Sequence, residues 1–270
     1  MANCINDNGQ IVGYQSPTAG PAQPIVWADG RASQLGSLGG DGGSASGINN
    51  AGQICGHAST AAGKAHSFIS ENGVMTDLAP SDPLQHVANA MNEFGHVVGT
   101  SPNYAYLWKD GQMTLLGSLG GGGTDARAVN DFDEVVGYSA TSRLRGQYHA
   151  FIWRNGVMTD IGHLGGGFSI GLGINNFGEV VGYSSTSNGG DAPFIWQKGV
   201  IKNLNDLIDP YSGWVLTNAF DINEAGQIVG SGRYNNVYHA FLLTLVPEPS
   251  TILALLCGIG ALPLLRRRRA

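Results

Sequence analysis

A nine-residue pattern that recurs six times constrains the fold of this chain more than any other feature. The pattern reads I-N-x-x-G-[QEH]-[IV]-V-G, with a few substitutions. Its copies begin at Ile5, Ile48, Met91, Val129, Ile174 and Ile222. Their asparagines are Asn6, Asn49, Asn92, Asn130, Asn175 and Asn223, which are separated by 43, 43, 38, 45 and 48 residues. A period of this length is typical of repeat proteins in which each copy is one small structural unit.

Two further motifs follow each copy and define the strands of the unit. The second motif, HAFIW in its fourth copy, begins at Pro24, His66, Tyr104, His149, Pro193 and His239. The third motif, GVMTDL in its clearest copy, begins at Gly73, Gly111, Gly156 and Gly199, with a weaker copy at Gly30. Asn-x-x-Gly in the first motif predicts a tight hairpin, in which Asn caps the turn and Gly takes a positive φ. Asp133 replaces this Gly in the fourth copy, and Asp tolerates that conformation. Asp-Gly or Asn-Gly between the second and third motifs predicts another hairpin.

The sequence therefore predicts four short strands per unit, which is the content of one propeller blade. The link from the third motif to the next unit has a constant length, since the step from Leu35 to Ala45 is ten residues and recurs from Leu78, Leu116 and Ile161. We expect an all-β, β-propeller-like ring of six four-stranded repeats in residues 1–245, with almost no helix before Ser250. The repeats lie near residues 2–44, 45–87, 88–125, 126–170, 171–218 and 219–245. A two-sheet sandwich fits the number of strands but not the regular period.

The three motifs, recurring in this order, resemble the HAF repeat family, named for the triplet seen at residues 149–151 and 239–241. The resemblance covers nearly all of residues 2–245 and implies an extracellular, β-propeller-like protein. The family brings no established catalytic residues, so none is carried over. The chain departs from the pattern at Tyr104 and Ala192, where His is expected, and at Ser70, where Trp is expected.

Residues 246–270 form a separate tail. Pro247, Glu248 and Pro249 end the folded region, because proline interrupts both strands and helices. Residues 251–265 are a 15-residue apolar stretch, which as a helix would span about 22 Å of the roughly 30 Å hydrocarbon core. The four residues that follow it are Arg266, Arg267, Arg268 and Arg269. Arginines directly after an apolar segment stay on the cytoplasmic side of a membrane, so we expect a C-terminal membrane helix rather than a buried core helix.

This order of Pro-Glu-Pro, apolar segment and arginine cluster resembles the PEP-CTERM sorting signal of Gram-negative bacteria. The resemblance implies recognition by an exosortase-type membrane protease, which removes the tail. It also implies a protein that is exported, held in the inner membrane by the tail, and then transferred to the cell surface or the extracellular space. Such tails accompany exopolysaccharide production and biofilm formation.

Composition narrows the function further. The net charge is −6, and without the four terminal arginines the rest of the chain carries −10, so binding to nucleic acid phosphates is disfavoured. Cys4, Cys55 and Cys257 form no C-x-x-C motif, which leaves no sign of a zinc ribbon or redox site. Cys4 and Cys55 either pair as a disulfide or, as we prefer, are two small buried hydrophobic residues. Their spacing does not decide between the two.

The candidate site residues are few. His66, His149 and His239 occupy equivalent positions and suggest either a ring of metal ligands or strand-end residues that bond to a neighbouring loop; Tyr104 and Ala192 interrupt the ring and favour the second interpretation. The tryptophans at fixed strand positions, Trp27, Trp108, Trp153 and Trp196, are expected to pack between units rather than to stack on sugars. The polar residues outside the repeat pattern are Asp82, His86, Asp125, Arg127, Arg143, Arg145 and Asp191. No motif connects them, so the sequence predicts no catalytic, cofactor-binding or metal-binding residues.

We therefore expect a non-catalytic binding or structural module, with surface polysaccharide as a candidate ligand and an extracellular glycan-active propeller enzyme as the alternative. The GVMTDL-type strand occurs five times, whereas the other two motifs occur six times. We expect the missing strand, together with a signal peptide, to be encoded upstream of Met1 and to pair with the last unit.

Overall fold

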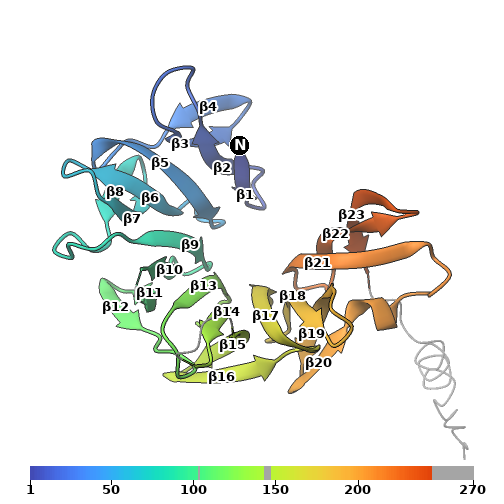
Figure 1. Ribbon diagram of the computed structural model, residues 1–270. Coiled ribbons are helices and arrows are strands. Elements are labelled where there is room, and N and C mark those ends of the chain that lie inside the picture. The colour runs from blue at the N-terminus through green and yellow to red at the C-terminus, as the bar shows by residue number, and fades with distance from the viewer. Residues whose placement is uncertain (103, 143–146, 245–270) are drawn as a thin grey trace, which may run out of the picture.

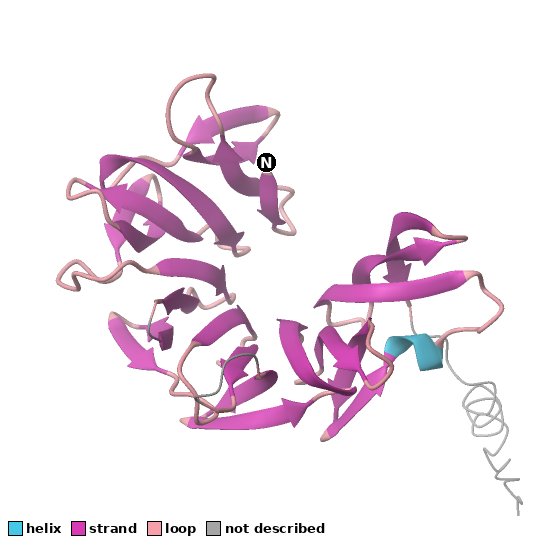
Figure 2. Cartoon of the chain, in the orientation of Figure 1, coloured by secondary structure: helices cyan, strands magenta, loops and turns pink. Residues whose placement is uncertain are grey.

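The computed structural model describes residues 1–102, 104–142 and 147–244, and this part of the chain is almost entirely β-structure. Its strands form six small antiparallel sheets, and the one helix among the described residues is the 3-10 turn η1 (Leu204–Leu207), drawn cyan in Figure 2. No described helix has the length and apolar character needed to cross a membrane. The tail, including Pro247, Glu248, Pro249 and Arg266 to Arg269, lies outside the described residues.

Each sheet is a simple meander whose strands follow one another in chain order. The first three sheets comprise β1 to β4 (Ala2–Ile5, Ile11–Gln15, Gln23–Ala28, Arg31–Gln34), β5 to β8 (Gly39–Ile48, Ile54–Thr60, Ala65–Glu71, Val74–Asp77) and β9 to β12 (Val87–Met91, Val97–Ser101, Tyr104–Lys109, Gln112–Leu115). The next two comprise β13 to β16 (Thr124–Val129, Val135–Ala140, Tyr148–Arg154, Val157–Gly162) and β17 to β20 (Gly165–Ile174, Val180–Thr186, Asp191–Gln197, Val200–Asn203). The sixth has three described strands, β21 to β23 (Trp214–Ile222, Ile228–Tyr234, Val237–Leu243).

The six sheets are arranged as an open ring, with the first strand of each sheet toward the middle and, in the five four-stranded sheets, the fourth strand outside (Figure 1). The expected β-propeller-like architecture is thus confirmed at the level of six antiparallel sheets, and the two-sheet sandwich is wrong. Two details differ from the expectation. The described part of the sixth repeat is three-stranded rather than four-stranded, and the ring is open between the first and last sheets (Figure 1).

The turns follow the predicted chemistry. In the first hairpin, the side-chain oxygen of Asn accepts a hydrogen bond from the backbone N–H four residues on, as from Gln10 to Asn6 at 2.9 Å. The Gly of the motif has a positive φ, for example 74° at Gly9, and Asp133 takes the same conformation at 60°. The Asp-Gly and Asn-Gly pairs of the second hairpin also have positive φ at both residues, as at Asn155 (48°) and Gly156 (87°), which is the geometry of a type I′ turn.

Apolar residues from consecutive sheets pack together and form the core. Five clusters of buried residues are found in the described chain, and each of the five contacts between neighbouring sheets has one. In one of them, Val136 and Ile152 from the fourth sheet pack with Ile174, Val180 and Phe194 from the fifth. A sheet of four short strands cannot bury both faces alone, so each repeat depends on its neighbours for its core.

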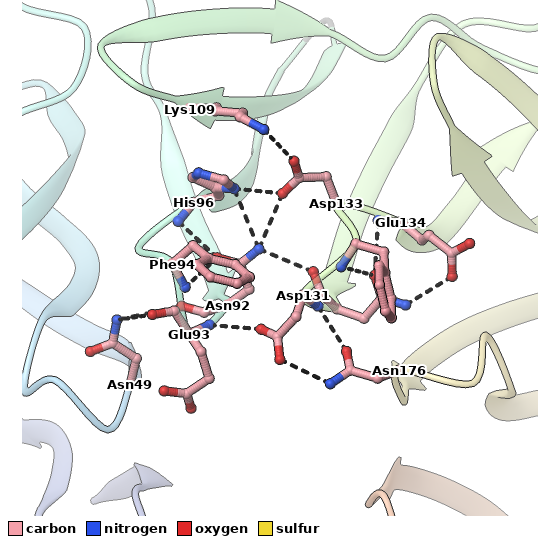
Figure 3. Close-up of polar contacts among 12 residues, drawn as sticks. Asn49, Asn92, Glu93, Phe94, His96, Lys109, Asp131, Asp133, Glu134 and Asn176 are labelled. Atoms are coloured by element: carbon pink, nitrogen blue, oxygen red, sulfur yellow. Dashed lines mark hydrogen bonds and ion pairs between the residues drawn. The ribbon is translucent and has the colours of Figure 1, made fainter.

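The asparagine of the first motif also connects neighbouring sheets, a role that the sequence analysis did not predict. Its side-chain N–H donates to the backbone carbonyl of the equivalent asparagine in the next sheet, as from Asn92 to Asn130 at 3.0 Å and from Asn130 to Asn175 at 3.1 Å. The following residue adds a second bond, as from the Glu93 N–H to the carboxylate of Asp131 at 3.0 Å. Figure 3 shows these bonds continuing from Asn49 to Asn176. We call this series of inter-sheet bonds the asparagine ladder.

Asp133, which replaces the motif glycine, strengthens this contact between the third and fourth sheets (Figure 3). One of its carboxylate oxygens lies 2.5 Å from Nδ1 of His96, and the other accepts a bond from Lys109 Nζ at 2.7 Å. These two partners lower the pKa of Asp133, although burial opposes the shift.

Candidate functional site

The histidines of the second motif pair with aspartates of the third motif in the same sheet. His66 Nδ1 lies 2.8 Å from Asp77, and His149 Nδ1 lies 2.7 Å from Asp160. Where Asp is replaced, as by Leu115 in β12, the His is replaced as well, here by Tyr104. The interpretation of these histidines as bonded strand-end residues is therefore confirmed for His66 and His149, with the correction that the partner is the adjacent outer strand and not a loop.

The tryptophans behave as expected inside the ring. Trp153 and Trp196 are buried in the clusters between sheets, and Trp108 packs against another. The expectation is wrong for Trp27 of the first sheet, which is 46% exposed and belongs to none of the five clusters.

The strongest candidate site is a pocket of about 520 Å³ at the second sheet. Two elements form most of it: the loop between β6 and β7, and the segment 79–83 that follows β8. Its lining residues are Leu38, Thr60, Ala61, Ala62, Lys64, His66, Asp77, Pro80, Ser81, Asp82 and Pro83. The link after β8 is the one of the four ten-residue links that contains no glycine, and its prolines and Asp82 replace the Gly-rich segment of the other links.

His86 lies behind this pocket and is fully buried. The other three links carry Gly43, Thr124 and Ser169 at the equivalent position, two residues before the next inner-strand Ala or Gly. The His86 ring contacts the rings of His66, Tyr104 and Tyr106 at centroid distances of 5.9, 6.0 and 5.9 Å. Its Nε2 lies 3.2 Å from Asp82 Oδ2, but neither ring nitrogen makes a hydrogen bond of good geometry within the described chain. Burial lowers the pKa of His86, and the nearby Asp82 opposes this shift only in part.

Asp82 is held as a carboxylate. Its Oδ1 accepts from the Leu84 N–H at 2.9 Å, and its Oδ2 accepts from the Tyr104 hydroxyl at 2.8 Å. These two hydrogen bonds, the Leu84 bond first, lower the pKa of Asp82, because each bond favours the charged form. The pocket therefore presents a fixed, ionised hydrogen-bond acceptor at its rim.

A second pocket of about 620 Å³ occupies the equivalent place in the fifth sheet. Leu164, Thr186 and Asn203 line it where Leu38, Thr60 and Asp77 line the first. Asp206 lies at its rim, on η1 rather than on a proline-rich link. The repeat thus builds the same hollow twice, and the side chains around it differ.

The other candidate residues do not join this pocket. Asp125 and Arg127 form an ion pair of 2.9 Å on the inner strand β13, and burial raises the pKa of Asp125 despite that partner. Asp191 is exposed at the start of β19. Arg143 and Arg145 lie outside the described residues.

Neither metal binding nor a disulfide is indicated within the described chain. No group of three or more His, Cys, Asp or Glu is placed there to hold a metal ion. Cys4 and Cys55 are free thiols, and Cys55 is buried, which raises its pKa to about 12.

The sequence marks Asp82 and His86 as polar residues outside the repeat pattern, but it does not predict the pocket that Asp82 lines together with His66 and Asp77. The missed signal is the loss of every glycine from one link of otherwise constant length. This link keeps the common length, but Asp and Pro stand where the other links have Gly, and its residues 80–83 line the pocket.

The fold is related to that of known propellers. The sequence matches no model of a known protein family and no curated protein. Among solved structures, the chain resembles the β-propeller domain of the Trilobed protease from Pyrococcus furiosus, described as having an open velcro topology, at a TM-score of 0.59 and 8% identity over 92% of this chain and 84% of that one.

Two longer proteins share the architecture. TolB from Acinetobacter baumannii matches at a TM-score of 0.54 and 14% identity, and Pyrococcus horikoshii acylaminoacyl peptidase at 0.55 and 10%. The matches cover 87% and 92% of this chain, which spans 61% of TolB and 46% of the peptidase. At these identities the likeness establishes the class of fold, a β-propeller-like ring, and no activity.

Proposed function

We propose that this chain is an exported, surface-sorted binding protein that takes a neutral glycan in the pocket at the second sheet. The observation that carries the proposal is this pocket of about 520 Å³, whose rim holds an ionised carboxylate at Asp82 and the His66–Asp77 pair. Carboxylates and imidazoles accept and donate hydrogen bonds to sugar hydroxyls, and Leu38 and the prolines offer apolar surface to a sugar face.

Charge restricts the class of ligand. Two carboxylates, Asp77 and Asp82, line the pocket, and Lys64 is the one Lys or Arg residue in its lining. The net charge of the whole chain is −6. An anionic ligand such as a nucleic acid would be repelled by this body. A neutral polysaccharide meets no such barrier.

The proposed localisation rests on the tail and on the repeats. The Pro-Glu-Pro motif, apolar segment and arginine cluster resemble the PEP-CTERM signal, and the body resembles the HAF repeats of extracellular proteins. Both resemblances support the proposal that the protein lies at the inner membrane before processing by an exosortase-type protease, and at the cell surface or outside it afterwards. A polysaccharide-binding propeller suits an exopolysaccharide-rich surface.

Binding is favoured over catalysis by the state of Asp82. A glycoside-cleaving site needs one carboxylic acid that keeps its proton near neutral pH. The pKa of Asp82 is instead lowered by its two hydrogen bonds, so this residue accepts hydrogen bonds and does not serve as the acid. The glycan-active enzyme remains the second candidate function because two carboxylates share the pocket.

Retention on immobilised polysaccharides tests the proposal. The full chain in detergent is passed over a panel of neutral and acidic polysaccharides, and the released sugar ends are measured in parallel. We expect retention on a neutral polysaccharide, no release of reducing ends, and about tenfold weaker binding for Asp82→Asn, since a charge-assisted hydrogen bond contributes about 1.5 kcal/mol.

Asp206→Asn, in the equivalent pocket of the fifth sheet, is the matched control and should bind like the unchanged protein. Equal loss in both variants, or retention on acidic polymers only, contradicts the assignment of the pocket. Release of reducing ends that Asp82→Asn abolishes would establish the enzyme instead.

A further inference from the structure

The outer edge of β23 in the sixth sheet has no strand beside it within the described chain. In each of the five other sheets, a fourth strand covers this edge of the third strand. The pairing has one register throughout. Phe68 pairs with Asp77, Tyr106 with Leu115, Phe151 with Asp160, Phe194 with Asn203 and Ile25 with Gln34. By this register, the residue that would lie opposite Phe241 on β23 has the position of Asp160.

His239 carries the side-chain half of the pair that such a strand would complete. It stands two residues before Phe241, as His149 stands before Phe151 and His66 before Phe68. Those two histidines bond to the Asp of their outer strand at 2.7 and 2.8 Å. His239 is exposed and borders a hollow of about 450 Å³, with its ring held near Trp214 and Tyr234 at 6.2 and 6.4 Å.

The backbone of β23 also offers a hydrogen-bond acceptor for such a strand, the carbonyl of Ala240. In three sheets the leucine after the fourth strand donates its N–H to the backbone carbonyl of the residue just before the position that Phe241 holds in β23. These bonds join Leu35 to Pro24 at 3.1 Å, Leu78 to Ser67 at 2.9 Å and Leu116 to Ala105 at 3.0 Å. Ala240 holds the equivalent position on β23.

We propose that β23 is a docking edge for an extended segment with the outer-strand sequence of this repeat, apolar-Met-Thr-Asp-apolar, supplied from outside residues 1–244. The segment binds antiparallel to β23, with its Asp opposite Phe241 and bonded to His239, and with the following N–H bonded to the carbonyl of Ala240. This is strand addition to a sheet edge. The His–Asp pair sets the register and selects the segment. The inference concerns a different part of the molecule from the glycan pocket and does not depend on it.

A peptide from the chain itself tests the proposal. Residues 155–165 (NGVMTDIGHLG) contain β16 with its Asp160, and residues 110–120 (DGQMTLLGSLG) are the natural counterpart with Leu115 at that position. Each is titrated into the full chain in detergent micelles, with affinity read by fluorescence anisotropy and protection of β23 amides read by hydrogen exchange. We expect the Asp peptide to bind about three- to tenfold more tightly than its own Asp→Ala version, to bind more tightly than the Leu peptide, and to slow exchange along β23.

The variant His239→Ala separates recognition from simple edge pairing. It should still bind the peptides, but the preference for the Asp peptide over its Asp→Ala version should fall to about onefold, as a double-mutant cycle requires for a direct pair. Absence of peptide binding, an Asp preference that survives His239→Ala, or β23 amides already protected in a dimer of the free protein would each overturn the proposal.

Discussion

The same positions of the repeat form the contacts between neighbouring sheets and the two end faces of the open ring. Their side chains are buried in the contacts and exposed on the end faces. The second valine of the first motif is fully buried at Val136 and Val181, where another sheet follows, but its equivalent Val229 in the last sheet is 44% exposed. The opposite face behaves in the same way. Ile48 and Ile174 are each 7% exposed, and Ile5 of the first sheet is 62% exposed.

This difference shows that burial in the molecule is a property of the contact between repeats, not of the residue. An isoleucine or valine of the motif is a core residue only if a neighbouring sheet covers it, as expected for a repeat protein whose stability depends on nearest-neighbour contacts. The end faces therefore serve as internal controls for every interior position.

The largest expected effect comes from a matched pair of apolar truncations. Ile152 is 1% exposed between the fourth and fifth sheets, and Leu242 holds the equivalent position in the sixth sheet at 59% exposure. Ile152→Ala should lower the free energy of unfolding by about 3 kcal/mol, because it leaves a cavity in a packed interface, whereas Leu242→Ala should cost less than about 1 kcal/mol. Urea denaturation of both variants measures the difference, and equal losses would show that the last sheet is covered in solution.

The asparagine ladder gives a second matched pair with a smaller effect. Asn130 is buried, caps its own turn and donates across to the Asn175 carbonyl. Asn223 caps its own turn in the same way, through the Gln227 N–H at 2.8 Å, but is exposed. We expect a loss of about 2 kcal/mol for Asn130→Ala and about 1 kcal/mol for Asn223→Ala, since only the first variant also removes a buried hydrogen bond between two sheets. Similar losses in the same urea experiment would assign the ladder residues to turn capping alone.

Local chemistry explains what could be predicted from the sequence. Strand order, the six sheets and the positive φ of Gly9 and Asn155 follow from residue types that act within one hairpin. The inter-sheet bond of Asn92 could not be predicted in this way, because its acceptor is 38 residues away and is specified only once the sheets stack. The pairing of His149 with Asp160 lies between these cases, since the two positions change together across the repeats.

The candidate pocket differs from its counterpart in the fifth sheet through a segment with no repeat pattern. The segment 79–83 takes its shape from prolines and from the hydrogen bonds of Asp82, and the burial of His86 depends on three aromatic residues from two different sheets. Because this segment occurs once in the chain, no second copy reveals its packing arrangement.

The contact between the second and third sheets is expected to respond to acid. Burial lowers the pKa of His86, and the groups that face this ring are Asp82, Asp77, His66 and two tyrosines. The unfolded chain therefore takes up a proton below about pH 6.5 more readily than the folded chain, so the stability that neutral His86 confers is complete above that pH and is lost as the pH falls.

The effect is measured as the change in unfolding free energy per pH unit between about pH 7 and pH 5. For the uptake of one proton this slope is at most about 1.4 kcal/mol per pH unit. His57, whose pKa is also lowered by burial, adds to the slope in the same direction. His86→Thr, which installs the residue found at the equivalent position of the fourth sheet, should flatten the slope, and Thr124→Ser should leave it unchanged. A slope that His86→Thr does not reduce would assign the acid response to other groups.

The smallest expected effect on the folded body is that of removing the tail, and it tests whether the end face of the sixth sheet is open. The face presents Val229, Leu242 and Phe220 at 44%, 59% and 50% exposure, and the apolar residues 251–265 follow it closely in the sequence. If the tail serves export alone, deletion of residues 247–270 should leave the thermal unfolding midpoint unchanged and release the protein from the cell surface, as followed by calorimetry and cell fractionation. A midpoint lower by several degrees, with a gain in dye binding to exposed apolar surface, would show instead that the tail covers this face, since about 1 kcal/mol of lost stability shifts the midpoint of a body of this size by roughly 2 to 4 °C. Replacing the four arginines by glutamine in the full chain separates the two roles, because it should impair sorting while any packing of the apolar residues persists.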